Sequence, residues 1–166
     1  HPTRINTKII EALELLHIDL CGPSAIESFG GSKYILVIVD DFSRFTRVFF
    51  LKQKSDATAK LKTFVKQVEV QLRKTVRNIR SDNVLEFKNN DFENFLADKG
   101  ITHNFSAPYT PQQNGIVERQ NRSLCEAART KFSFASLPLY FWADVVATAC
   151  FTQNRSLLNK RFAVTT

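Results

Sequence analysis

The chain has 166 residues and a hydrophobic content of 43%, which suits one domain with a substantial core. Its formal net charge of +7 favours a polyanionic partner over an acidic one, although charge alone leaves a merely basic surface equally open. No apolar stretch approaches 18 uncharged residues, so the sequence predicts no membrane-spanning segment.

The first half of the chain predicts a three-stranded antiparallel meander. Residues 1–12 are polar and basic without a clear period and are interpreted as a linker. In residues 13–20 apolar and polar side chains alternate, which places His17 and Asp19 on the face opposite the apolar ones. Short turns join the next two apolar runs. The expected strands are 13–20, 34–39 and 44–51.

The second half alternates helices with strands. Ser55 is expected to cap a helix whose apolar residues recur at spacings of three and four. A loop rich in Pro, Gln and Asn, residues 106–113, precedes a long helix with Val117 and Asn121 on its inward stripe. A meander followed by this alternation predicts an α/β fold, a mixed five-stranded sheet flanked by helices. The remaining expected elements are strands at 76–80 and 101–105, helices at 91–99 and 114–133, and a last helix starting at Pro138.

Three acidic residues, Asp19, Asp82 and Glu118, occupy positions that suit a shared metal site. Asp19 lies within a strand, Asp82 follows a strand at its carboxyl end, and Glu118 lies in the first turns of the long helix. Two divalent cations roughly 4 Å apart need oxygen ligands from separate elements. Such ions activate an attacking hydroxyl and stabilise the departing oxygen of a phosphodiester. Without metal the three carboxylates repel one another, so we expect a loosely arranged site.

Each of these acids also has an ordinary structural explanation. Asp19 could form a salt bridge, because an unpaired buried carboxylate is costly. Asp82 could form an Asx turn or cap a helix. Glu118 is favoured by the helix dipole, by up to about 1 kcal/mol. Only the set of three shifts the balance towards a metal site.

Other reactive side chains are expected to be structural. Asp40 and Asp41 form a second acid pair, for which a role in the turn between two strands is the favoured interpretation. His17 is interpreted as a core or edge histidine. Three widely separated cysteines form no CxxC pair, so we expect free thiols and no zinc within this chain. The chain begins at His1 and has no methionine, and is therefore interpreted as a piece of a longer polypeptide.

Five segments carry a resemblance to a known family. HIDLCGP, VDDFSRF, RSDNVLEF, SAPYTPQQNGIVERQNRSL and LPLYFWADVVATACFTQNR resemble the integrase core of copia-type long-terminal-repeat retrotransposons. The resemblance covers residues 13–158 and includes the 35 residues between Asp82 and Glu118. It implies a ribonuclease-H-like fold with Asp19, Asp82 and Glu118 as catalytic and metal-binding residues. On this interpretation 1–12 links to an upstream region and 159–166 begins a downstream segment.

The family resemblance also implies an activity and its partners. Two Mg²⁺ or Mn²⁺ ions would support the joining of element DNA to target DNA. Water first trims the 3′ end where needed, and the exposed 3′ hydroxyl then attacks a target phosphate. The family further implies a homo-oligomer that acts in the nucleus, after residence in a cytoplasmic particle, with no membrane partner.

Five polar residues around the start of the long helix are candidates for DNA contacts. Gln112, Gln113 and Asn114 offer hydrogen-bond donors near the reacting phosphate. Arg119 and Arg122 flank the acid of that helix, and we expect them to contact phosphates. The alternatives are a solvent-exposed loop and solvated arginines.

One departure from the family pattern concerns Val84, two residues after Asp82, where the family usually has glycine. A β-branched residue there costs roughly 1–3 kcal/mol if a positive φ is needed. A catalytically decayed, non-enzymatic DNA-binding remnant is therefore the alternative function. A nuclease acting on RNA–DNA hybrids is a third, against which the PYTPQQNG block and the 35-residue gap argue.

Overall fold

The computed structural model describes residues 8–82, 85–106, 111–156, 158–159 and 164–165, with side chains in 8–82, 85–106 and 115–156. Val84, residues 107–110 and the side chains of Gln112, Gln113 and Asn114 therefore lie outside the described part. The domain limits expected at residues 12 and 158 stay predictions.

A five-stranded mixed sheet forms the centre of the fold, in the order β3-β2-β1-β4-β5. The first three strands form the expected antiparallel meander. The last two run parallel to β1. This arrangement confirms the predicted α/β, ribonuclease-H-like architecture. The strands are β1 (Leu15–Cys21), β2 (Tyr34–Asp40), β3 (Thr46–Leu51), β4 (Asn78–Ser81) and β5 (Thr102–Phe105).

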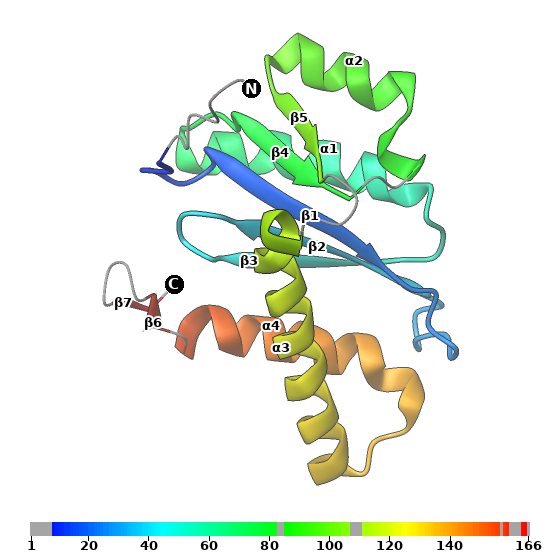
Figure 1. Ribbon diagram of the computed structural model, residues 1–166. Coiled ribbons are helices and arrows are strands. Elements are labelled where there is room, and N and C mark those ends of the chain that lie inside the picture. The colour runs from blue at the N-terminus through cyan, green and yellow to red at the C-terminus, as the bar shows by residue number, and fades with distance from the viewer. Residues whose placement is uncertain (1–7, 83–84, 107–110, 157, 160–163, 166) are drawn as a thin grey trace.

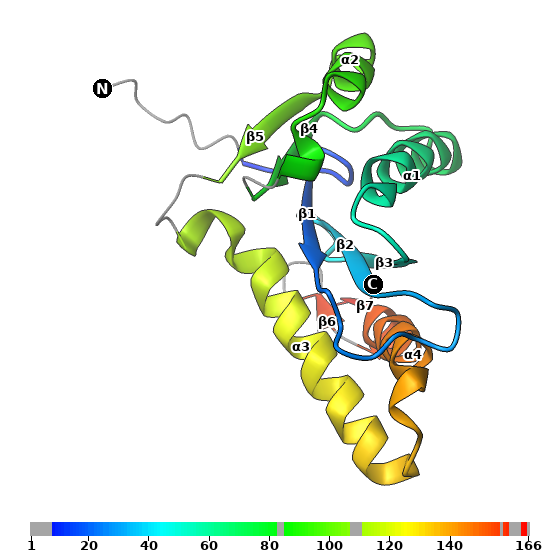
Figure 2. The ribbon, with the colours of Figure 1, turned by 90° about the vertical axis from the view of Figure 1, so that its right-hand side faces the viewer.

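Helices cover both faces of the sheet (Figure 1, Figure 2). Ile18 and Leu36 point into a core shared with the helices of one face, whereas Val37 packs with Val117 from the other. The strands therefore alternate as their sequence predicted. The first face carries α1 (Asp56–Leu72) and α2 (Asn90–Lys99), and the second carries α3 (Pro111–Ala135) and α4 (Trp142–Ser156).

The helix ends differ from expectation in two places. Ser55 precedes α1 as predicted, but its side chain makes no capping hydrogen bond. The long helix α3 begins at Pro111, so the last part of the loop expected at 106–113 is helical. Proline suits the first turn of a helix, because the N–H groups of that turn have no acceptor within the helix. Pro111 was therefore a sequence signal for the earlier start.

Short elements were not predicted from the sequence. A 3₁₀ helix, η1 (Leu85–Phe87), follows Asp82 at a short distance along the chain. A second, η2 (Leu139–Phe141), replaces the helical turn expected at Pro138. The strands β6 (Leu158–Asn159) and β7 (Val164–Thr165) pair with each other. Within the described ranges, every helix is too short or too polar to cross a membrane.

Candidate metal and nucleic-acid site

Parallel pairing of β1 with β4 brings Asp19 and Asp82 to one end of the sheet. Ile18 lies opposite Ser81 in the register, Asp19 is the next residue of β1, and Asp82 is the first residue after β4. Such strands are about 4.8 Å apart. Because Ile18 faces the α1 side, alternation turns Asp19 towards α3. Both aspartates are half-buried.

Asn121 on α3 completes this corner of the site. Its side-chain amide donates hydrogen bonds to Oδ2 of Asp19 and to the Cys21 sulfur, the latter at 3.3 Å. Its carbonyl oxygen is buried and has no hydrogen-bond partner among the described residues. Sequence reasoning assigned Asn121 to the packed stripe of the helix and missed its contact with Asp19. The available signal was an amide within an otherwise apolar stripe.

The pKa of the Cys21 thiol is sensitive to the negative charge of both aspartates. This thiol donates to Asp19 at 3.4 Å. Burial raises the pKa of the Cys21 thiol to about 12, with further contributions from Asp19, Cys125 and Asp82. Both aspartates therefore act on the same thiol, which stays protonated and is a poor metal ligand at neutral pH.

Glu118 belongs to no metal-binding cluster of three acidic, His or Cys side chains among the described residues. It is exposed in the third turn of α3, one turn before Asn121. Among the residues with described positions, no three His, Cys, Asp or Glu side chains are close enough to share a metal ion. The structure thus brings together two of the three predicted acids, and the complete metal triad stays a prediction.

The expected DNA contacts are only partly described. Arg119 and Arg122 are exposed on α3. The Arg119 guanidinium lies along its own helix, where a Cβ at Gly115 would be 3.1 Å from its Nη1. Both arginines are accessible to a phosphate, and their role stays a prediction.

The second acid pair and the histidine have the structural roles expected of them. Asp40 accepts hydrogen bonds from the backbone N–H groups of Leu13 and Ser43, each at 2.8 Å, and so fixes the turn after β2. His17 is 1% exposed, and its Nε2 lies 2.8 Å from Oδ1 of Asp41. Asp40, Asp41 and His17 therefore make structural contacts. The Asp19 carboxylate instead contacts Asn121 at the candidate site.

The side chains at this corner fit a hard divalent cation. Asp19 and Asp82 would supply carboxylate oxygens to such an ion, and the unpartnered carbonyl of Asn121 would offer a neutral one. Mg²⁺ and Mn²⁺ prefer such oxygen ligands. The unsatisfied oxygen is also costly to bury without a partner, which a cation or its bound water would provide.

Comparison with known proteins places this arrangement in a family. Residues 11–111 match a family model described as integrase core domain, and residues 99–139 match a second model of the same description. The chain is 40% identical over 147 residues to the retrovirus-related Pol polyprotein from transposon TNT 1-94 of Nicotiana tabacum, covering 89% of this chain and 11% of the polyprotein. It is 34% identical over 143 residues to that from transposon RE2 of Arabidopsis thaliana, covering 86% and 10%. The chain therefore spans about a tenth of these relatives.

Two solved structures share the fold at low sequence identity. The HTLV-2 integrase catalytic core domain in complex with magnesium, in its trimeric form, has a TM-score of 0.66 and 19% identity, covering 92% of this chain and 93% of that chain. The simian T-cell lymphotropic virus intasome in complex with PP2A regulatory subunit B56 gamma gives 0.71 and 20%, covering 92% and 52%. Sheet order, helix placement and these likenesses define a ribonuclease-H-like integrase core. The chain belongs to the integrase core domain family, within the copia-type retrotransposon branch.

Proposed function

We propose that this chain joins the 3′ ends of retroelement DNA to target DNA by polynucleotidyl transfer. The observation that carries the proposal is that Asp19 on β1 and Asp82, directly after the neighbouring strand β4, follow the paired residues Ile18 and Ser81, while Asp19 contacts α3. Glu118 is one helical turn from Asn121, which touches Asp19, and completes the proposed site. The magnesium in the HTLV-2 core supports metal dependence by analogy.

Each residue of the proposed site has its own role in the reaction. Asp19, Asp82 and Glu118 hold two Mg²⁺ or Mn²⁺ ions, which when bound supply the charge that activates a hydroxyl and stabilises a departing oxygen. Asn121 orients the Asp19 carboxylate through its hydrogen bond. A 3′ hydroxyl then attacks a target phosphate, so one P–O bond forms as another breaks and the target 3′ oxygen leaves.

DNA is the proposed partner, in line with the net charge of +7. Arg119 and Arg122 contact its phosphates, and Gln112, Gln113 and Asn114 contact it beside the reacting group. The trimeric and intasome forms of the solved neighbours favour action as a homo-oligomer. Integration would take place in the nucleus, after a stage in a cytoplasmic particle.

A disintegration and strand-transfer assay on short labelled duplexes tests the proposal. We expect product with Mn²⁺ or Mg²⁺ and none with EDTA. Glu118→Gln should lower the rate at least about 100-fold, since even supporting residues around a metal cost 10–100-fold. Glu126→Gln, an exposed glutamate on the same helix, is the matched control and should keep full activity. Equal rates for both variants would remove Glu118 from the site.

The alternative is a non-enzymatic DNA-binding remnant. Its supporting observation is that no three His, Cys, Asp or Glu side chains form a metal-binding cluster among the described residues. Val84, in place of the usual glycine, points the same way. This alternative predicts salt-sensitive DNA binding without turnover. Turnover by Val84→Gly but not by the parent chain would establish decay at that residue, and cleavage only of an RNA–DNA hybrid would instead identify a hybrid nuclease.

A further inference from the structure

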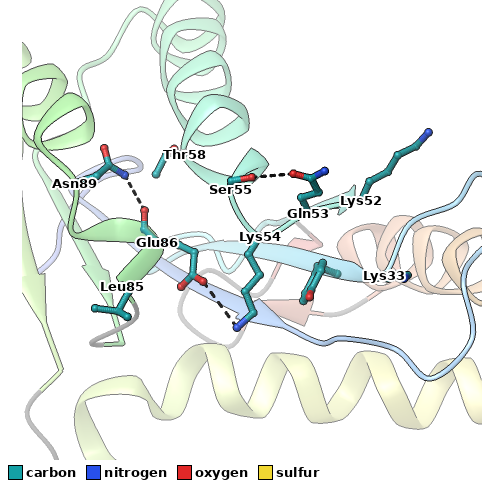
Figure 3. A pocket seen from close by; sticks show the side chains of 10 residues that line it. Lys33, Lys52, Gln53, Lys54, Ser55, Thr58, Leu85, Glu86 and Asn89 are labelled. Atoms are coloured by element: carbon teal, nitrogen blue, oxygen red, sulfur yellow. Dashed lines mark hydrogen bonds and ion pairs between the residues drawn. The ribbon is translucent and has the colours of Figure 1, made fainter.

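An open pocket of about 690 Å³ lies at the end of the sheet where β1 and β4 finish (Figure 3). Its walls come from the start of β2, the end of β3, the start of α1, and η1. Three lysines line it: Lys33, Lys52 and Lys54. None of the DNA contacts proposed above uses these residues.

Strand pairing places the backbones of the lysines close together. Tyr34 lies opposite Leu51 in the antiparallel register of β2 and β3. The backbone N–H of Lys33 donates to the carbonyl of Leu51 at 2.9 Å. Lys33 and Lys52 therefore extend from adjacent strand ends, and Lys54 follows before α1 begins.

The pocket adjoins both strands that carry the aspartates. Gly22, which follows β1, packs so tightly that a Cβ there would be 2.7 Å from the Lys33 carbonyl oxygen and 2.8 Å from Tyr34 Cδ1. Leu85 and Glu86 line the opposite wall and follow Asp82 within a few residues. The pocket and the aspartates therefore share one end of the sheet, with α1 lining the pocket and α3 contacting Asp19.

The charges of the pocket are weakly neutralised. Lys54 lies 3.7 Å from Glu86, a long contact that Figure 3 shows. Lys33 pairs with Glu27 at 2.9 Å, and both of these side chains are largely exposed. Lys52 forms no ion pair with any residue that the structure describes. Exposed ion pairs contribute about 0–1 kcal/mol, so a phosphate can replace them readily.

The lysine side chains that line the pocket favour a nucleic-acid phosphate backbone as the ligand. Lysine ammonium groups bind phosphate as point charges. Lys54 already covers the Tyr34 ring at 6.0 Å, which leaves that ring less available for stacking on a base. The amino end of α1 adds positive potential at Ser55.

We propose that Lys33, Lys52 and Lys54 bind backbone phosphates of DNA, beyond the phosphate that reacts at the aspartates. That the DNA is a substrate rests on the proposed function, whereas phosphate binding itself does not. Each phosphate neutralised by a lysine changes the slope of log affinity against log salt by about 0.9. The salt dependence of DNA binding therefore measures how many phosphates the lysines contact.

Fluorescence anisotropy with a labelled duplex in EDTA, over a series of salt concentrations, measures this slope for the whole chain. Lys52→Ala/Lys54→Ala should reduce its magnitude by about 1.8, two contacts at about 0.9 each. The matched control is Lys60→Ala/Lys66→Ala, which removes the same charge from exposed positions on α1. Thermal melts check that both variants fold. Equal slopes for both double variants would overturn the proposal.

Glu86 provides the opposite test. Glu86→Gln removes the acid beside Lys54, so it should tighten DNA binding more than Glu126→Gln, which changes net charge equally. Equal tightening by the two would show a mere net-charge effect and contradict the pocket. DNA binding that depends on the lysines, without strand transfer, would support the pocket and contradict the proposed function. Strand transfer with binding that does not depend on the lysines would support the function and contradict the pocket.

Discussion

Asn121 on α3 donates a hydrogen bond to Asp19 on β1, 102 positions away in the chain, at an N–O distance of 2.5 Å. Val117 and Leu124 on either side of Asn121 are buried, so the helix is held firmly at this point. The orientation of the Asp19 carboxylate is therefore set by the same helix that carries Glu118.

Asn121→Ala should destabilise the metal-free chain by about 1.5–3 kcal/mol, the range for hydrogen bonds to charged groups. Gln120→Ala is a matched control, because Gln120 makes a neutral side-chain hydrogen bond to Gln153 at 3.0 Å. That variant should cost only about 0.5–1.5 kcal/mol. Urea denaturation in EDTA measures both free energies of unfolding. If Asn121→Ala lowered the free energy of unfolding less than Gln120→Ala did, the hydrogen bond to Asp19 would contribute little to stability.

Divalent cations should stabilise the chain through the aspartate pair. Mn²⁺ in excess over its dissociation constant raises the unfolding temperature, because it binds the folded state preferentially. Asp19→Asn and Asp82→Asn should each abolish most of that increase. Asp144→Asn, an exposed aspartate on α4, should preserve it. Scanning calorimetry with and without Mn²⁺ tests this without any activity assay, and an increase that survives both aspartate variants would place the ion elsewhere.

The sequence predicted the sheet because its signals are local. The alternation around Asp19 and the apolar run at 34–39 are each contained in a few residues, and short turns dictate the meander. Asp82 at a strand's carboxyl end was likewise readable, since parallel strands place such residues at one edge. These local rules determine where two of the three acids lie.

Contacts across long stretches of chain were not readable in this way. Asn121 has the spacing of a packing residue, and only the docking of α3 brings it to Asp19. The lysine pocket depends on the register of Tyr34 with Leu51, which no local pattern specifies. The proposed approach of Glu118 to the aspartates would depend on the conformation of a helix side chain and on metal, neither of which spacing determines.

The stability of the chain should fall in the pH window that starts at about 6.5, the ordinary pKa of histidine, and extends downwards, because of His103. Burial lowers the pKa of His103 below its ordinary 6.5, although Glu93 at 3.4 Å acts in the opposite direction. The unfolded chain therefore binds more protons, so the contribution is present above about 6.5 and is lost as pH falls towards the folded-state pKa. Urea denaturation at several pH values measures this loss.

His103→Gln should flatten the pH dependence in that window. Glu93→Gln should steepen it, because the carboxylate that favours the charged ring is gone. Glu11, whose pKa is lowered from 4.5 by Lys74, acts only at lower pH and does not interfere. His103 Nε2 also lies 2.8 Å from the hydroxyl of Ser81, the residue before Asp82. A pH profile unchanged by His103→Gln would assign the loss to other groups.

Cys21 should be almost inert to alkylation in the metal-free chain. With its pKa raised to about 12 from 9.0, mainly by burial, the thiolate fraction at pH 8 is roughly 1000-fold smaller than for an ordinary thiol. Asp19→Asn should increase the alkylation rate, and so should Mg²⁺, because each reduces the negative charge that opposes the thiolate. Iodoacetamide labelling followed by peptide mass spectrometry measures Cys21 separately from the exposed Cys125, which serves as the internal control. Rapid labelling of Cys21 in EDTA at pH 8, equal to that of Cys125, would contradict the charged and buried environment assigned to this thiol.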